Sequence, residues 1–227
     1  YLPGISSYPL TLGWSEASRY YYASLFAGQR VYGFSVPPSV LHPSRYLLQA
    51  IPFLIPNSGI WLHRFWNALL WLGLPLATAG LLVRRLDLKD RTLRRMAVPW
   101  VVLFLFQGPL LFHLLVPVIL VLAGYRAQSL WRSLLVVLLA SAWAGISRIN
   151  WLAVPGFIAA TLYFLERPRG DEPLIRYWGR PALWIGAGSL AAVLSYSGYV
   201  LLSGNEAEQF GSSLASDLLA YRLLPNR

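Results

Sequence analysis

Cysteine is absent from the 227-residue sequence, so disulfide bonds, thiolate metal sites and cysteine nucleophiles are excluded. Acidic residues are scarce: nine aspartates and glutamates stand against 19 lysines and arginines, which gives a formal net charge of +10. Charged residues of both signs make up only 12% of the chain, about half of their usual share in soluble domains. With 56% hydrophobic residues, this composition is typical of an integral membrane protein.

The sequence also lacks the signatures of common soluble enzymes. It contains no GxxxxGK[ST] phosphate loop, HExxH zinc motif, GxSxG nucleophile elbow or GxGxxG loop at a strand-to-helix turn. The positive charge does not indicate nucleic-acid binding, because the basic residues lie in short loops between apolar runs. Charges placed in this way orient a protein in a membrane.

The first 57 residues contain no run of about 20 apolar residues, so they are not expected to cross a bilayer. Two short helices are predicted there, at residues 15–27 and 43–54, the second with Pro43 at a favourable first position. Short amphipathic helices of this kind lie along a membrane surface. We therefore expect residues 1–57 to form a non-cytoplasmic outer loop that carries interfacial helices.

Apolar runs dominate the rest of the chain. Residues 59–83 and 181–203 are each long enough to span the hydrocarbon core. Residues 96–124 are interrupted at 107–109, where Gln-Gly-Pro disfavours a continuous helix. If the chain turns back at this break, the basic loop at residues 125–132 lies on the same side of the membrane as the basic loop at 84–95. The positive-inside rule favours this hairpin over a straight crossing, which would place the two loops on opposite sides.

The last apolar run, residues 131–166, carries Arg148 in its middle. An arginine that faces lipid there costs several kcal/mol, so either its side chain lines a polar cavity or the chain turns back. The turn predicts two helices, at residues 133–147 and 151–165, with Arg148 and Asn150 at their tip.

These runs predict an all-α integral membrane fold of about six transmembrane or half-membrane helices, with the bundle at residues 58–203 and a non-cytoplasmic segment at 204–227. Twelve of the 19 basic residues fall in three predicted loops, residues 84–95, 125–132 and 166–180. By the positive-inside rule these loops are cytoplasmic, and we expect a bacterial plasma membrane. Because the chain starts at Tyr1 and its one methionine is Met96, we also expect it to be part of a longer protein.

Short helices at membrane depth need protein or a water-filled cavity over their ends. We expect the breaks at 107–109 and 147–150 to form the bottom of one polar cavity that residues 1–57 cover. Such a cavity suits a substrate with a polar head and a lipid tail. Glu16, the one acidic residue among the first 86, is a candidate general base or metal ligand there. The structural alternative is a helix-start acid that pairs with the helix dipole or with Arg19.

Basic residues complete the candidate site. Arg148 can clamp a phosphate with its planar fork of donors, or it ends a helix and snorkels to the interface. Asn150 adds a donor beside it, and Arg45 is expected on the same side. His42 is a candidate ligand or base, and an ordinary loop histidine is the alternative.

Aromatic and other polar residues near these positions have structural alternatives too. Tyr20 and Tyr21 form either a platform for a sugar or head group, or an anchor in the interfacial aromatic belt. Arg64, at the start of a span, is expected to anchor that helix. His113 lies in an apolar helix, where a buried, hydrogen-bonded histidine is expected.

The run Trp14-Ser15-Glu16-Ala17, continued by Arg19 to Tyr22 and by His42-Pro43-Ser44-Arg45-Tyr46, precedes short paired helices and resembles bacterial polytopic glycosyltransferases of the GT-C class. The resemblance implies inverting transfer of a sugar from a polyprenyl-phosphate donor at the outer face of the membrane. It places Glu16 in the role of the first-loop carboxylate, often assisted by a divalent metal such as magnesium or manganese. It also implies that Arg148, and less directly Arg45, binds the donor phosphate.

Two other classes of function fit the same composition. A non-catalytic integral membrane subunit, packed against membrane protein partners in a larger complex, would carry the same helices and charges. A transporter would need a polar path between both faces, which residues 59–83 and 181–203 do not offer. A polar cavity that joins Glu16 to Arg148 would favour sugar transfer over the subunit.

Overall fold

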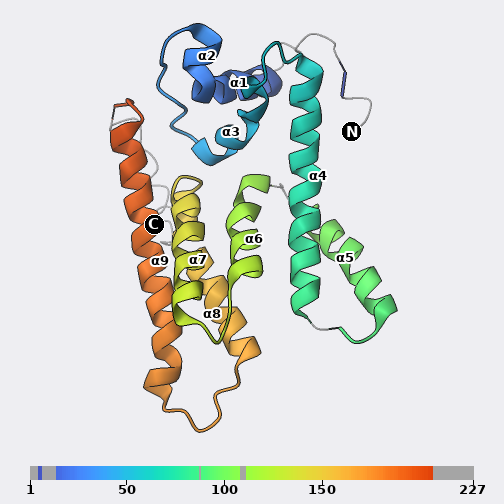
Figure 1. The fold of residues 1–227 in the computed structure, drawn as a ribbon, viewed down its shortest axis with the longest axis vertical. Coiled ribbons are helices and arrows are strands. Elements are labelled where there is room, and N and C mark those ends of the chain that lie inside the picture. The colour runs from blue at the N-terminus through green and yellow to red at the C-terminus, as the bar shows by residue number, and fades with distance from the viewer. Residues whose placement is uncertain (1–4, 7–13, 87, 108–110, 207–227) are drawn as a thin grey trace, which may run out of the picture.

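The computed structural model describes residues 5–6, 14–86, 88–107 and 111–206, and every regular element in these ranges is a helix (Figure 1). The predicted all-helical architecture is therefore confirmed. Helices α1 to α3 lie across one end of a bundle built from α4 to α9, as Figure 1 shows. Most of the predicted segment 204–227 lies outside the described residues.

The N-terminal segment folds into short helices, as the sequence predicts. Its elements are α1 (Trp14–Ser24), η2 (Leu25–Ala27), α2 (Gly28–Tyr32), α3 (Pro43–Gln49) and η3 (Ile51–Leu54). Pro43 occupies the first turn of α3, where its missing N–H leaves no hydrogen bond unmade. Helices α1 and α3 pack against each other, and α3 also contacts α4, so this segment closes one end of the bundle.

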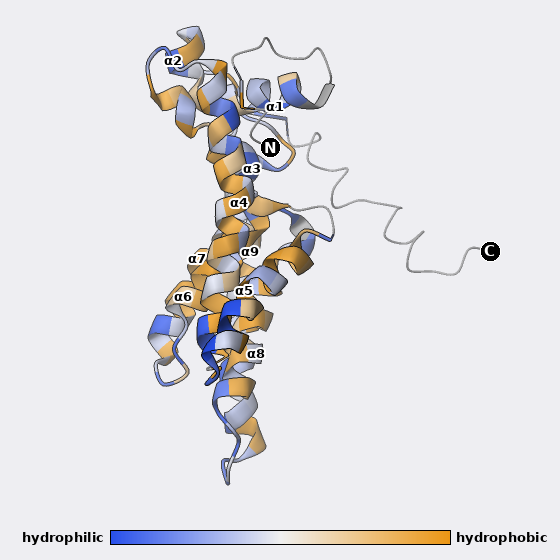
Figure 2. Cartoon of the chain, turned by 90° about the vertical axis from the view of Figure 1, so that its right-hand side faces the viewer, coloured by the Kyte–Doolittle hydropathy of each residue, from blue (hydrophilic) through white to orange (hydrophobic). Residues whose placement is uncertain are grey.

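Two helices in the described part of the chain are long and apolar enough to cross a membrane, α4 (Ile60–Arg85) and α9 (Leu174–Leu202). They contain 26 and 29 residues, so each exceeds the roughly 20 residues that a bilayer core of about 30 Å requires. Figure 2 shows apolar residues along the lengths of the helices and polar residues concentrated at the connections between them.

Both breaks predicted within long apolar runs are present. The first separates α5 (Arg91–Leu105) from η4 (Phe112–Leu114) and α6 (Leu115–Gly124). The second separates α7 (Leu130–Gly145) from α8 (Val154–Glu166), with η5 (Ile149–Trp151) at the tip. The chain reverses direction across each break, and the tip of α7 and α8 faces the N-terminal helices (Figure 1). Gly108 and Pro109, on which the first of these predictions depends, lie outside the described residues.

The loops are shorter than predicted, because helices extend into them. Helix α5 starts five residues before Met96, since the side chain of Asp90 caps it by accepting from the backbone N–H of Thr92 at 2.7 Å. Helix α9 starts seven residues before Pro181, the residue at which the sequence predicts its first turn. The helix continues N-terminal of this proline because Tyr177 is buried there, its ring 5.3 Å from that of Tyr163.

The three predicted cytoplasmic loops meet at one end of the bundle. Arg85, at the end of α4, donates from Nε to the carbonyl oxygen of Leu122 at 2.6 Å and from Nη2 to that of Tyr125 at 2.8 Å. Its third group, Nη1, forms an ion pair with Glu166 at the end of α8. One arginine thus joins the ends of α4, α6 and α8 on the face that carries the basic connections.

Close backbone approach holds the C-terminal half of the bundle together. A Cβ atom on Gly145 of α7 would lie 2.2 Å from the carbonyl oxygen of Ala192, and one on Gly156 of α8 would lie 2.6 Å from the Cα of Ile185. Both contacts are with α9. Small residues at such crossings are typical of helices that pack in a membrane, where dispersion contacts replace the hydrophobic effect between helices.

Candidate functional site

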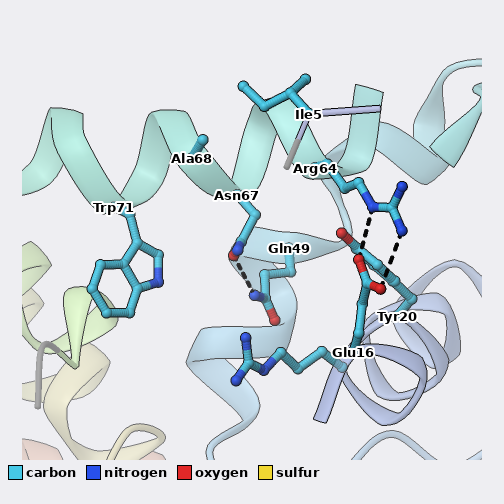
Figure 3. Close-up of a pocket in the computed structure, with 9 residues that line it drawn as sticks. Ile5, Glu16, Tyr20, Gln49, Arg64, Asn67, Ala68 and Trp71 are labelled. Carbon is cyan, nitrogen blue, oxygen red and sulfur yellow. Dashed lines mark hydrogen bonds and ion pairs between the residues drawn. The ribbon is translucent and has the colours of Figure 1, made fainter. Parts of the chain in front are cut away.

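Glu16 lies in the first turn of α1 and is bound by Arg64, one turn into α4. Nε and Nη2 of Arg64 donate to the two carboxylate oxygens at 2.8 and 3.1 Å, and Nη1 donates to the carbonyl oxygen and to the hydroxyl of Ser6 at 2.9 and 3.1 Å. Figure 3 shows this two-pronged contact. Glu16 therefore pairs with Arg64, for which the sequence predicted only an anchoring role.

A cavity of about 230 Å³ opens beside this ion pair. It is enclosed by residues of α1, α3 and α4 and by Ile5 (Figure 3). Its lining residues are Ile5, Glu16, Arg19, Tyr20, Gln49, Arg64, Asn67, Ala68 and Trp71. The carboxylate of Glu16 thus lies at a cavity under the N-terminal helices. The breaks at 107–109 and 147–150, which were expected to form the bottom of such a cavity, contribute no described residue to its lining.

The wall opposite Glu16 is formed by a pair of amides. Nε2 of Gln49 donates to Oδ1 of Asn67 at 2.7 Å, which orients both side chains (Figure 3). Oε1 of Gln49 is buried and accepts no hydrogen bond from the described residues. A buried carbonyl oxygen without a donor is costly, so this wall favours a ligand or water that carries a hydroxyl or N–H group.

The two predicted tyrosines take different positions. Tyr20 lines the cavity with its ring 5.6 Å from that of His63, and burial raises the pKa of its hydroxyl. Tyr21 is not among the lining residues and is 54% exposed, with its ring 5.4 Å from that of Tyr22. Only Tyr20 is therefore placed to contact a molecule in the cavity.

The predicted residues His42 and Arg148 belong to a second cluster, where α3 meets the tip of α7 and α8. Nδ1 of His42 lies 3.3 Å from the carbonyl oxygen of Ser147, and the hydroxyls of Ser44 and Ser147 are hydrogen-bonded at 2.7 Å. Arg148 and Asn150 follow on the exposed side of this tip. The start of α3 is thus bonded directly to the turn that the sequence predicted around Arg148.

His113 lies beneath this junction, in η4. Its side chain is completely buried, and its ring centre is 5.7 Å from that of His42. The expected hydrogen bond is not found: neither ring nitrogen has a partner among the described residues. Its backbone is fixed instead, because Nε1 of Trp143 donates to its carbonyl oxygen at 2.9 Å.

The electrostatics of this second cluster favour negative charge. Burial lowers the pKa of His42, and the charges of Arg148 and Arg45 lower it further. The hydrogen bond that Nδ1 donates to the carbonyl oxygen of Ser147 opposes this shift. Burial also lowers the pKa of Arg45, and the nearby charge of Arg19 adds to the effect. Within the described ranges, no carboxylate pairs with any of these three arginines.

Arg19 and Arg45 connect the two groups of residues. Arg19 lines the cavity beside Glu16, and its charge acts on Arg45, whose own charge acts on His42. Arg148 and Asn150 are not among the residues that line the cavity, so the expected cavity that joins Glu16 to Arg148 is not found among the described residues. The cavity at Glu16 and the cluster at Arg148 are therefore neighbouring features at the same end of the bundle.

Comparison with models of known protein families, with curated proteins and with solved structures finds no match. What this end of the bundle can do therefore follows from its own residues.

The cavity supplies few ligands for a metal ion. Glu16 is the one carboxylate among its lining residues, and the described part of the chain contains no group of three or more histidine, cysteine, aspartate or glutamate side chains. Because Mg²⁺ and Mn²⁺ are usually held by several oxygen ligands, such an ion would take most of them from substrate or water. The expected divalent metal remains a prediction.

Four lining residues for which the sequence indicated no binding role come from the first turns of α4. Arg64, Asn67, Ala68 and Trp71 are spaced i, i+3, i+4 and i+7, so they share one helix face. Arg64 and Asn67 are polar residues on one face at the start of a long apolar helix, and this pattern could have indicated a binding surface. The spacing of these residues does not show which other helix covers that face.

Proposed function

We propose that this chain is an integral membrane protein that transfers a sugar from a lipid-phosphate carrier on the non-cytoplasmic face of a bacterial plasma membrane. The observation that carries the proposal is the cavity at Glu16, which opens between the short surface helices and α4 and is lined by Glu16, Arg19 and Arg64 among others. This cavity lies at the end of the bundle opposite the basic connections joined by Arg85. A carrier whose lipid tail lies in the outer leaflet would place its head group at that level.

The proposed reaction is an inverting displacement at the anomeric carbon. An acceptor hydroxyl attacks this carbon, its proton passes to the carboxylate of Glu16, and the bond from the carbon to the phosphate oxygen breaks. The phosphate leaves with the bonding electron pair. Arginines at the same end of the bundle, Arg148 foremost and Arg45 beside it, stabilise the charge on that group.

Arg64 sets a condition for this reaction. A carboxylate that accepts two hydrogen bonds from a guanidinium is a weak base, because the ion pair favours its charged form. In the proposed mechanism the acceptor hydroxyl therefore displaces one of these two hydrogen bonds before Glu16 takes the proton. Arg64 remains close enough to orient the carboxylate through the other.

The test is transfer of labelled sugar from a polyprenyl-phosphate donor by the protein in membranes. We expect Glu16→Gln to lower turnover by a factor of about 10² to 10⁴, the usual contribution of a general base. Glu206→Gln removes an exposed carboxylate near the same end and serves as the matched control. Undiminished turnover in the Glu16 variant would remove this residue from the mechanism.

A second variant tests the donor site. We expect Arg148→Ala to raise the donor concentration required for half-maximal rate and also to lower the rate at saturation, because the arginine is proposed both to bind the carrier phosphate and to stabilise its charge as it leaves. Equal donor requirement would leave Arg148 with the role of ending α7 at the membrane surface.

One observation favours a second candidate function, a non-catalytic membrane subunit. Both oxygens of Glu16 are already bound by Arg64, an arrangement that also suits a purely structural ion pair between α1 and α4. In that case no transfer is detected, and Glu16→Gln and Arg64→Gln impair assembly with membrane partners to the same degree. Co-purification from native membranes distinguishes this outcome from loss of catalysis alone.

A further inference from the structure

Helix α5 contains no buried residue, although it follows the long helix α4 directly. Its main neighbour is α4, and it lies beside the C-terminal half of that helix (Figure 1). Five residues of α5 are partly buried and share one face by their helical spacing: Ala97, Val98, Val101, Val102 and Leu105. Leu105 packs against the apolar cluster that contains Leu70 of α4, so this face is the one turned toward α4.

The opposite side of α5 is exposed and apolar. Its large apolar residues are each more than half exposed: Leu93, Met96, Trp100, Leu103 and Phe104. Their spacing of i, i+3, i+7, i+10 and i+11 places them on a single face of the helix. The rings of Trp100 and Phe104 stack there, with centres 6.0 Å apart and planes at 13°. A continuous apolar surface of this kind marks contact with a membrane or with another protein.

A cluster of positive charge lies at the start of the same helix and in the connection before it. Its members are exposed: Arg84, Lys89, Arg91, Arg94 and Arg95. None of the five pairs with a carboxylate in the described ranges. Asp90 is the one acidic residue among the described residues from 84 to 107, and its carboxylate caps α5 by accepting from the N–H of Thr92. The cluster therefore remains positive and open to solvent.

The order of these two features along α5 identifies what covers it. A phospholipid has its charged head group at the membrane surface and its apolar chains below, and α5 presents basic residues first and apolar residues after them. A lipid with a neutral head group would match the apolar face alone. A second copy of this chain in the same orientation would bring two positive clusters together, which their repulsion opposes. Basic residues beside a membrane helix attract anionic lipids, each strengthening binding about fivefold.

We propose that the exposed side of α5 binds an anionic phospholipid of the cytoplasmic leaflet. Arg91, Arg94 and Arg95 hold the head group, and an acyl chain lies along the apolar face at Trp100 and Phe104. This site is at the end of the bundle opposite the cavity at Glu16 (Figure 1). The inference rests on the membrane location that the proposed function assumes, and it is independent of sugar transfer.

The experiment counts lipid molecules bound to the purified full chain, by native mass spectrometry of the protein released from detergent micelles. The probes are dioleoyl phosphatidylglycerol and dioleoyl phosphatidylcholine, which have the same acyl chains and differ in the net charge of the head group. Titration of each lipid gives a dissociation constant for the first molecule bound. The same spectra report whether the chain is a monomer or a dimer.

Two triple variants remove equal charge from different places. The α5 variant combines Arg91→Gln, Arg94→Gln and Arg95→Gln. The control variant removes three exposed arginines at the other two basic connections, by Arg126→Gln, Arg132→Gln and Arg176→Gln. A third variant keeps the charge of α5, with lysine at the same three positions as the α5 variant.

We expect the unaltered chain to bind phosphatidylglycerol more tightly than phosphatidylcholine. The α5 variant should weaken phosphatidylglycerol binding about hundredfold, the product of three losses of about fivefold each, while the control variant and the lysine variant stay close to the unaltered chain. Trp100→Ala combined with Phe104→Ala should weaken both lipids by the same factor, because this change removes apolar contact and no charge. If the α5 variant does not fold, Arg91→Gln and Arg94→Gln singly carry the test, each with about a fivefold loss.

Three results overturn the inference. The first is equal affinity of the unaltered chain for the two lipids. The second is an equal loss in the α5 and control variants, which would show that charge acts from the whole basic end and not from α5. The third is a dimer that binds no lipid and dissociates when Trp100 and Phe104 are replaced by alanine, which would assign this face to a second copy. A chain that transfers sugar without preferring the anionic lipid contradicts this inference alone, and one that prefers it but transfers no sugar contradicts the proposed reaction alone.

Discussion

Arg64 holds both carboxylate oxygens of Glu16, at 2.8 and 3.1 Å, across 48 residues of sequence. The contact joins the first helix of the N-terminal segment to the first long apolar helix. It therefore does two things at once: it fixes α1 over the cavity and it sets the basicity of the carboxylate. These two roles can be separated experimentally.

The first prediction concerns the structural role of this pair. Glu16→Gln and Arg64→Gln are each expected to speed hydrogen exchange in the amides of α1, because either change removes the same charged contact. Arg64→Gln should have the larger effect, since it also removes the hydrogen bonds to Ser6. The double variant should exchange no faster than Arg64→Gln alone, since the contact with Glu16 is already lost there. Arg30→Gln is the control. Additive effects of the two changes would show that the residues do not act as a pair.

The second prediction is a pH dependence at His42. Burial lowers its pKa, so between the folded value and the unfolded value of about 6.5 the folded chain binds fewer protons than the unfolded chain. Stability therefore rises with pH in this window and falls as the pH drops below about 6.5. Arg45, Arg148 and His113 face the ring, and none of them offsets a new positive charge.

Hydrogen exchange of residues 39–50 at pH values from about 8 to about 5 measures this effect. Because amide exchange is base-catalysed, the comparison uses protection factors corrected for the intrinsic rate. Those of residues 39–50 should fall on acidification, while those of α9 stay high. His42→Gln, which does not titrate in this range, should reduce this loss of protection. The part that remains belongs to His113, because burial lowers its pKa to about 3. An unchanged pH profile in that variant would assign the titration to another group.

Several features of the fold follow from local sequence. The turn at residues 146–153 was predictable because an arginine in the middle of an apolar run is costly unless it reaches water or a cavity, and Arg148 is exposed there. The break before Phe112 was predictable for another reason, because a Gln-Gly-Pro run disfavours a continuous helix. The early start of α5 depends on the cap at Asp90, and that of α9 on the packing of Tyr177 against Tyr163, a contact between helices that apolar runs do not predict.

The site was predictable in part. Glu16 and Tyr20 stood out as polar or aromatic residues on a loop over a membrane, and both line the cavity. Arg64 and Gln49 could not be assigned, because their partners come from other helices and spacing along one helix does not identify a neighbour. His113 illustrates the limit most clearly: its burial followed from an apolar run, but the absence of a hydrogen-bond partner among the described residues is a tertiary property.

The third prediction concerns Arg85. Replacing it by methionine should lower stability by about 1–3 kcal/mol, because the carbonyl oxygens of Leu122 and Tyr125 and the carboxylate of Glu166 lose their shared donor. Arg84→Met is the matched control, since Arg84 is its exposed neighbour on the same helix. Thermal denaturation in detergent compares the two. Equal melting temperatures would show that this contact contributes nothing measurable.

The fourth prediction concerns close packing against α9. Gly145→Val and Gly156→Val should destabilise the bundle by about 1–3 kcal/mol or more, since even a Cβ would overlap the backbone of α9. Gly186→Ala is the control, because a Cβ at this position would have nothing within 4 Å. It should be neutral or slightly stabilising, as alanine favours a helix over glycine. Thermal denaturation ranks the three variants, and a tolerated valine at Gly145 would contradict the observed contact.

The last prediction tests the orientation on which the proposed function depends. Because the chain has no cysteine, single cysteines can report accessibility without removing native ones. Ser35→Cys and Asn150→Cys should react with a membrane-impermeant maleimide from the non-cytoplasmic side. Lys89→Cys, Gln128→Cys and Asp171→Cys should react only after the membrane is opened, as the positive-inside rule requires for the basic connections. All five positions are exposed.

Gln128 is the decisive position among these five. Gln128 follows α6, so it lies on the same side of the membrane as Lys89 only if the chain turns back between α5 and α6. A straight crossing would place Gln128 on the same side as Ser35. The side on which Gln128 lies therefore decides whether α5 and α6 form a hairpin in the bilayer, with η4 and His113 at the level of the cavity. Labelling of Gln128→Cys in intact cells would indicate a straight crossing that places η4 inside the bilayer, which would contradict the reversal between α5 and α6 in Figure 1.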